Sequence, residues 1–270
     1  DTTGGPSGTN AAGTVATTNT NLDLNATTLT GATILNSGGG NIQISSIVGG
    51  SEDLTLAAGI GAGTTTVTGM VAGLGDGTGA ALTIADGVTG LVHFQDTFAA
   101  GSGIVASAAT SSIRFDGDVT LTNGDTATSL PGPLQLDGLT FSGFDGLTFG
   151  ALTLSGAAVT LNSNGSAIQI DSIVGGAQNL IFNAGTTGAI TVSGAVDNVS
   201  TLTLTQSNGA TFQGNVGQGT AGAVTITDTA DGQTVAFQDN AAITTLTTAA
   251  QGYNVSFTGT TNVITNDTNF

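Results

Sequence analysis

The chain has 270 residues, of which 18 are acidic and one is basic, so its formal net charge at pH 7 is −17, and it contains no cysteine. This composition excludes disulfides and thiolate metal sites, and it argues against binding to nucleic acid or to an anionic membrane, because phosphate neutralisation needs Lys and Arg. No apolar run approaches the ~20 residues of a membrane-spanning helix, so membrane insertion is not expected.

The N-terminal segment differs in composition from the rest of the chain. Residues 1–20, DTTGGPSGTNAAGTVATTNT, contain one large aliphatic side chain, Val15. Such a segment cannot build a core, so we predict a flexible N-terminal arm or linker over residues 1–20 and a folded region over residues 21–270. Because the chain starts at Asp1 without a Met or a signal peptide, we interpret it as a mature secreted product or an excised fragment.

From Leu22 onward, short runs of alternating apolar and polar residues follow one another. Examples are LDL, IQIS, LTLA, VHFQ, IRFD, LTLT and VTIT, and Gly, Asn, Asp and Ser separate the runs. Alternation with period two is the pattern of a β-strand, and the separating residues favour turns. We therefore expect an all-β fold with almost no helix.

The spacing of these runs predicts a solenoid. Pairs of phenylalanines, such as Phe94 with Phe115 and Phe237 with Phe257, recur after about 20–25 residues, within the range of coil-forming repeats. A coil of this size cannot bury its own apolar face, so coils stack and share one core. We expect the following rings to be buried in that core: Phe94, Phe115, Phe182, Phe212, Phe237 and Phe257.

An internal duplication supports the same interpretation. TLTGATILNSGGGNIQISSIVGGSEDLTLAAG at 28–59 matches TLSGAAVTLNSNGSAIQIDSIVGGAQNLIFNAG at 153–185. The duplicated regions extend over about 28–125 and 153–265. They share apolar spacing and Gly turns, whereas exposed positions change. A scaffold requires that pattern, and a duplicated catalytic site would be expected to repeat its polar groups instead.

The segment 126–156 between the copies is less regular. It holds Pro131 and Pro133, and proline cannot donate to a strand ladder, so PGP predicts a turn or loop. Phe141, Phe144 and Phe149 follow. We interpret the segment as one overfilled coil at the junction; the alternative is a protruding binding loop.

The residues that could carry chemistry are few. Asp116, Asp118 and Asp125 lie in two short acidic Gly turns and are candidate calcium ligands, although the segment fits neither an EF-hand nor a calcium β-roll repeat. Their alternative role is that of solvated turn residues. His93 and Arg114 each precede a Phe, so we expect them to stack on the outer surface as an incidental pair. We predict no catalytic residues and no cofactor other than calcium.

The repeat style resembles that of a known class of proteins. The run FNAGTTGAITVSGAVDNVSTLTLT and the TFQGN, AFQDN and RFDGD motifs are similar to the β-strand repeats of large secreted bacterial surface proteins. Autotransporter passengers and filamentous-haemagglutinin-like adhesins are the nearest families. The resemblance covers about residues 22–265 and implies a right-handed parallel β-helix, export, and a role in adhesion or surface structure.

We therefore predict a single elongated right-handed parallel β-solenoid with about a dozen irregular coils. We expect an extracellular or cell-surface structural protein, a subunit of a fibre, filament or layer; the alternative is the stalk or binding region of an adhesin. Its expected partners are further copies of itself, with surface glycans or cell receptors as alternatives. Because of the acidic charge, assembly should depend on divalent cations or on carboxylate protonation.

Two remoter functions are weighed against these. A polysaccharide-degrading β-helix enzyme is disfavoured because the single Arg cannot supply the basic groups that a lyase needs. Ice binding requires Thr at identical positions on successive coils, and we expect unequal coil lengths to break such a row.

The ends of the solenoid suggest how it would polymerise. The alternating strand pattern begins directly after residue 20 and continues almost to the C-terminus. The sequence predicts no polar cap or helix at either end. Either the chain is cut from a longer solenoid or open ends pair with neighbouring subunits, with residues 1–20 adding as a strand to a neighbour.

Overall fold

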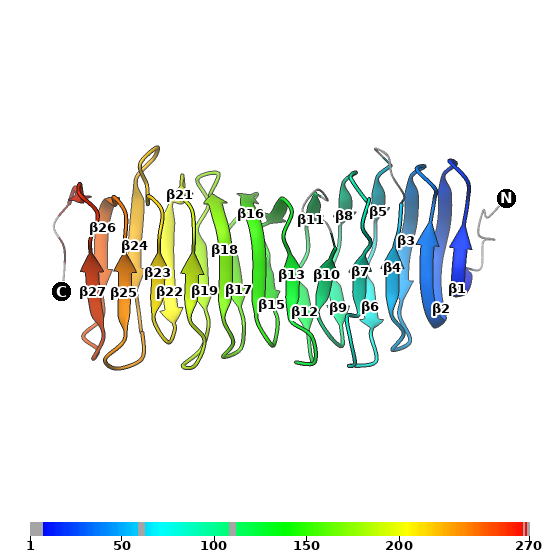
Figure 1. Ribbon diagram of the computed structural model, residues 1–270, viewed down its shortest axis with the longest axis horizontal. Coiled ribbons are helices and arrows are strands. Elements are labelled where there is room, and N and C mark those ends of the chain that lie inside the picture. The colour runs from blue at the N-terminus through cyan, green and yellow to red at the C-terminus, as the bar shows by residue number, and fades with distance from the viewer. Residues whose placement is uncertain (1–7, 59–62, 108–111, 267, 269–270) are drawn as a thin grey trace. The chain divides into compact units, whose positions relative to one another are not determined.

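The computed structural model describes residues 8–58, 63–107, 112–266 and 268. In this part of the chain the fold is all-β, as predicted: 28 strands form parallel ladders that stack as a β-solenoid of about 12 turns (Figure 1). No helix in the described ranges is long and apolar enough to cross a membrane. The handedness and the elongated shape stay predictions.

By its contacts the chain divides into two compact units. Unit 1 comprises Asp1–Gln135 and Gly143–Asp145, and unit 2 comprises Leu136–Ser142 and Gly146–Phe270. Residues of strand β14 (Leu134–Asp137) belong to both. The strands of unit 1 are β1 (Thr9–Ala16), β2 (Leu22–Asn36), β3 (Ile42–Val48), β4 (Leu54–Leu56), β5 (Thr65–Val67), β6 (Val71–Leu74), β7 (Leu82–Ile84), β8 (Val92–Phe94), β9 (Phe98–Ala100), β10 (Ile104–Ala106), β11 (Ile113–Phe115), β12 (Val119–Leu121) and β13 (Thr128–Leu130).

Unit 1 contains three parallel ladders, to which successive turns contribute one strand each. The first ladder joins the start of β2, the start of β3, β5, β8 and β11. The second joins the middle of β2, the end of β3, β6, β9 and β12. The third joins the end of β2, β4, β7, β10 and β13. Every core strand therefore pairs with its equivalent one turn away.

Unit 2 is built in the same way. Its strands are β15 (Thr140–Ser142), β16 (Leu147–Ser155), β17 (Val159–Asn162), β18 (Ile168–Val174), β19 (Leu180–Asn183), β20 (Ile190–Val192), β21 (Val196–Asp197), β22 (Thr201–Gln206), β23 (Ala210–Phe212), β24 (Gly222–Ile226), β25 (Thr234–Phe237), β26 (Ala242–Thr248), β27 (Asn254–Phe257) and β28 (Val263–Ile264). One ladder runs from the start of β16 through β18, β20, β23 and β25 to β27. Another runs from β15 through β17, β19, β22 and β24 to β26.

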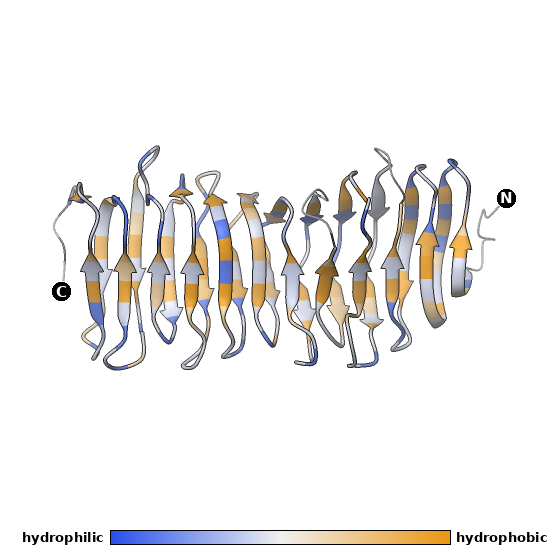
Figure 2. Cartoon of the chain, in the orientation of Figure 1, coloured by the Kyte–Doolittle hydropathy of each residue, from blue (hydrophilic) through white to orange (hydrophobic). Residues whose placement is uncertain are grey.

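The strands alternate buried and exposed side chains, which is why the apolar and polar residues alternate in sequence (Figure 2). Five of the six phenylalanines expected in the core are buried. Phe94 stacks on Phe115 with ring centroids 5.0 Å apart, and Phe212 stacks on Phe237 at 5.2 Å. The sixth, Phe257, stacks on Phe237 at 4.8 Å but is only half-buried.

The internal duplication is visible in the structure. Strands β3 and β18 have the same length and the same order of buried and exposed positions. Their following turns also agree, since Gly50 and Gly176 have φ of 60° and 54°, and Ser51 and Ala177 have φ of 65° and 62°. The two copies therefore repeat backbone geometry as well as apolar spacing.

Some polar residues are repeated too, and these hold turns. Ser37 and Ser163 are buried, and each donates its hydroxyl to the carbonyl oxygen three residues later at 2.5 Å. Asn36 and Asn162 each accept a hydrogen bond from the backbone amide two residues later, at 2.8 and 3.1 Å. Their contacts are with the neighbouring backbone, so their repetition follows from the turn geometry.

The predicted flexible arm differs from the structure. Residues 1–7 lie outside the described residues, but Thr9–Ala16 form β1, which pairs in parallel with β2 from Thr9↔Thr27 to Ala16↔Asn36. Only Ala11 is buried among the residues of β1. A strand needs backbone pairing more than a core of its own, so a segment of small residues can cover the ladder edge of β2.

The junction segment contains the predicted turn. Pro131 and Pro133 lie between β13 and β14 and are exposed, as expected of residues that cannot donate to a ladder. In unit 2, Phe141 and Phe149 are buried, with ring centroids 5.2 Å apart. The third ring of the segment, Phe144, is half-buried, so two of the three phenylalanines lie in the core.

Candidate functional site

One outer surface of unit 1 is polar at every described position. It consists of two rows of outward residues: one lies between buried residues within the strands of the first ladder, and the other continues past the ends of its short strands β5, β8 and β11. We call this surface the polar face. Its first row, in register from strand to strand, is Asp23, Gln43, Thr66, His93 and Arg114. The second row, two residues further along each strand, is Asn25, Ser45, Thr68, Gln95 and Asp116.

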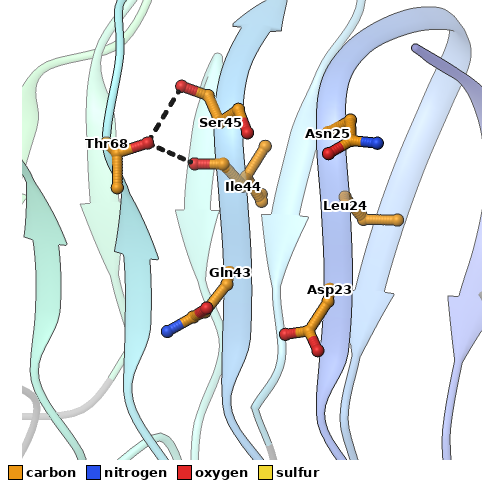
Figure 3. A pocket seen from close by; sticks show the side chains of 7 residues that line it. All are labelled: Asp23, Leu24, Asn25, Gln43, Ile44, Ser45 and Thr68. Atoms are coloured by element: carbon orange, nitrogen blue, oxygen red, sulfur yellow. Dashed lines mark hydrogen bonds between the residues drawn. The ribbon is translucent and has the colours of Figure 1, made fainter. Parts of the chain in front are cut away.

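A groove opens at the β2 end of the polar face. It has a volume of about 350 Å³ and is lined by Asp23, Leu24, Asn25, Gln43, Ile44, Ser45 and Thr68. Figure 3 shows Asp23 and Asn25 on one strand, Gln43 and Ser45 on the next, and Thr68 on a third. The Thr68 hydroxyl donates to the carbonyl oxygens of Ile44 and Ser45, at 3.4 and 3.3 Å. The groove therefore presents one carboxylate, two amides and two hydroxyls above an apolar core.

The other part of the polar face holds the only His and the only Arg of the chain. His93 and Arg114 are ladder partners, and both contact Asp116: His93 Nε2 lies 2.7 Å from Asp116 Oδ2, and Arg114 Nε donates to Asp116 Oδ1 at 2.5 Å. The Gln95 amide lies 3.4 Å from His93 Nδ1, where it can donate. The expected stacking of His93 and Arg114 is confirmed, but their joint contact with Asp116 was not anticipated.

Two opposed effects set the acidity of Asp116. Burial raises the pKa of its carboxyl, and the hydrogen bonds from Arg114 and His93 lower it further than burial raises it, so that the net pKa lies below its ordinary value of 3.8. Asp116 is therefore ionised near neutral pH. With both His93 nitrogens and both Asp116 oxygens in contact with neighbours, the cluster fastens one turn to the next and offers no free base for catalysis.

The three candidate calcium ligands are engaged separately. Asp116 contacts His93 and Arg114, and Asp125 Oδ2 accepts a hydrogen bond from the Gly79 amide at 2.6 Å. Asp118 is exposed directly before β12. Within the described ranges, no group of three or more His, Cys, Asp or Glu side chains could hold a metal ion. The structure gives these three carboxylates no common centre.

A second groove of about 430 Å³ lies on the third ladder of unit 1, and Asp53 is one of its lining residues. Asp53 Oδ1 is buried without a hydrogen-bond partner. Burial raises the pKa of the Asp53 carboxyl, and the charges of Asp76 and Glu52 raise it further. The groove is lined largely by small and apolar residues around this one carboxylate, which is a cost to the fold at neutral pH.

The expectation that unequal coil lengths break every row of threonines is wrong. Unequal turn lengths do not break the outward row of one unit 2 ladder, because the extra residues are accommodated in loops and in two register shifts, at Phe182/Asn183 and Gly222/Val224, and the row itself stays aligned. The row nevertheless contains an isoleucine among threonines. In order, it is Thr140, Thr160, Ile181, Thr203, Thr225 and Thr247.

No family model matches the chain, and neither a curated protein nor a solved structure matches it. The β-solenoid is compatible with the β-helix repeat regions to which the sequence motifs are similar.

Proposed function

We propose that this chain is an extracellular or cell-surface structural protein, a non-enzymatic subunit of a fibre, filament or layer. The repeated features support this proposal. Across the two copies the buried positions and the turn geometry recur, whereas some outward residues differ, such as Ser45 and Asp171. A stacked scaffold depends on the recurring features, and its outward residues are free to diverge.

The observation that supports self-assembly is the half-exposure of apolar side chains on strand β27. Val255 and Phe257 are half-exposed, although their ladder partners Val235 and Phe237 are buried. In the proposal, a strand of a second copy extends this ladder and covers the Phe257 ring. A contact of this kind joins different surfaces of two subunits, so repetition produces an open filament unless rotation closes it. Residues 9–16 pair with β2 of their own chain as β1, so they do not serve as an arm that adds to a neighbouring copy.

Sedimentation velocity and negative-stain microscopy over a concentration series test this function. Polymers are expected, with lengths that respond to pH, salt and divalent cations because of the net charge of −17. Phe257→Asp should prevent polymerisation, whereas Ser256→Asp, on the outward side of the same strand, is the matched control. Monodisperse monomers of the unaltered chain at high concentration would defeat the proposal.

The alternative is the stalk or binding region of an adhesin, with surface glycans or cell receptors as partners. The unbroken polar face of unit 1 favours it, because a surface built only to stack turns needs no continuous polar row. Microscopy of the native material separates the two functions: ordered polymer supports the structural subunit, and isolated rods tethered to cells support the adhesin.

A further inference from the structure

The polar face differs from the other two outer surfaces of unit 1. The outward rows of the second and third ladders include apolar side chains, among them Val48, Ala72 and Ala99 on the second and Ile34 and Val105 on the third. The first ladder has none at its ten outward positions. The groove beside Asp23 and Gln43 lies on this ladder, so the surface whose outward residues are all polar is also the one that contains this groove.

The chemistry of the polar face restricts its ligand. An apolar ligand would leave amides, hydroxyls and a carboxylate without partners, which is costly. An anionic ligand is opposed by the net charge of −17, and the single Arg is already held by Asp116. A cationic ligand would meet one carboxylate, Asp23, outside the Asp116 cluster, so most of the face suits a neutral ligand that both donates and accepts many hydrogen bonds, and the hydroxyls of a sugar do both.

The spacing of the polar face restricts the ligand further. The rows carry one polar side chain per strand, and neighbouring strands lie ~4.8 Å apart, which is about the length of one sugar ring in an extended chain. A linear polysaccharide lying across the strands would meet an equivalent pair of side chains at each ring. The face carries no aromatic side chain, so each ring is held weakly and several rings must bind together.

We propose that the polar face of unit 1 binds a linear, neutral, β-1,4-linked polysaccharide, with the groove at Asp23, Asn25, Gln43, Ser45 and Thr68 as its principal subsite. The extended ribbon of such a chain fits a periodic row of side chains better than the coiled chain of an α-1,4-linked polymer does. In the groove, Asp23 accepts from sugar hydroxyls, and the Gln43 amide both donates and accepts. No bond is made or broken. The proposal concerns unit 1 alone and does not depend on self-assembly through β27.

Isothermal titration calorimetry with cellohexaose and mannohexaose tests the proposal, with maltohexaose and oligogalacturonate for comparison. The first two should bind, and cellobiose should bind at least tenfold more weakly than cellohexaose because it spans fewer strands. Asp23→Ala and Gln43→Ala should each weaken hexaose binding about fivefold to tenfold, the loss of one or two hydrogen bonds. All of these side chains are exposed, so the variants should fold.

Gln169→Ala supplies the matched control, because Gln169 occupies the same place in β18 that Gln43 occupies in β3. It should leave binding unchanged. Failure of both β-1,4-linked hexaoses to bind, tighter binding of oligogalacturonate, or equal weakening by Gln43→Ala and Gln169→Ala would overturn the proposal. Hexaose binding should also be measured with the Phe257→Asp variant. This variant should bind as the unaltered chain does, so a failure of sugar binding can be told apart from a failure of polymerisation.

Discussion

The two copies, 28–59 and 153–185, agree in their buried strand positions and differ at some of their outward positions. Ile44 and Ile170 are both buried, and the serines Ser37 and Ser163 make the same turn contact. On the outer surface, the acidic Asp53 of the first copy is replaced by Asn179, which is exposed. Stacking fixes the inward positions and the turns, whereas the outward positions of each copy can acquire properties of their own.

The same contrast applies to the turns that follow. In unit 1, the outward residues beside Phe94 and Phe115 are His93, Arg114 and Asp116, which form an ion-paired cluster. In unit 2, Phe212 and Phe237 stack equally closely, but their outward neighbours Thr211, Ala236 and Gln238 carry no charge. The core is thus alike in both units, and the electrostatics are particular to the first.

The largest expected effect is a loss of stability, and it tests whether the burial of a core side chain determines how much that side chain contributes. Phe237→Ala should destabilise the protein by about 3–5 kcal/mol, because it removes a fully enclosed ring and leaves a cavity. Phe257→Ala should cost clearly less, since that ring is already half-exposed. Chemical denaturation of monomeric samples measures both. Equal losses would show that Phe257 is as enclosed as Phe237 and would contradict the difference in burial.

Much of the fold follows from the sequence because its pattern is local. Period-two alternation identifies strands, and the recurring Phe identifies stacked turns. The strand β1 was not predicted, since its small side chains give no alternation, and its order comes from backbone pairing with β2. The half-burial of Phe257 was also missed, because the alternating pattern around Phe257 is the same as that around the buried Phe237.

The outer surface was less predictable because it depends on register. Gln43 aligns with Asp23 and with Thr66 only after the loop lengths fix which residues meet. The alignment of His93 with Arg114 could be inferred from the Phe that follows each of them. The contact of both with Asp116 could not, because it depends on side-chain direction. The buried oxygen of Asp53 likewise results from a groove that no local pattern marks.

The second effect tests the agreement between copies at a polar position. Ser37→Ala and Ser163→Ala should each cost about 1–2 kcal/mol, because each removes a buried hydroxyl that donates to a half-buried turn carbonyl. Urea unfolding should give a somewhat larger loss for Ser37→Ala, because the Ser37 hydroxyl also lies 3.1 Å from the carbonyl oxygen of Ala58. Ser200→Ala, at an exposed position outside the repeated turn, is a reference for nonspecific effects. A loss in one copy alone would mean that the repeated turns are not equivalent.

The third effect tests the ion-paired cluster that distinguishes unit 1. Asp116→Asn should cost about 1 kcal/mol at pH 7, a modest value because the side chains are partly exposed. Since the folded-state pKa of Asp116 lies below 3.8, its contribution is present above that value and is lost as pH falls through the lower folded value. Unfolding of both proteins between pH 7 and pH 2 measures the difference. Gln238→Ala in unit 2 should show no such dependence on pH, and a difference that persists unchanged at pH 2 would refute the electrostatic explanation.

The smallest effect runs in the opposite direction and concerns Asp53. Its carboxyl pKa is raised by burial and by the charges of Asp76 and Glu52, so the folded state holds the proton more tightly than the unfolded state does. The resulting stability is fully present below pH 3.8 and is lost as pH rises through the folded pKa, which leaves a cost at pH 7. Asp53→Asn, which copies Asn179 of the second copy, should therefore stabilise the protein at pH 7 by about 0.5 kcal/mol and should have no stabilising effect near pH 3. Asn179→Asp is the reciprocal control: that position is exposed, so the new charge should change the free energy of unfolding by less than Asp53→Asn does. If Asp53→Asn destabilises at pH 7, the buried carboxylate has a favourable partner that the charges around it do not supply, and the first copy is acidic there for a structural reason.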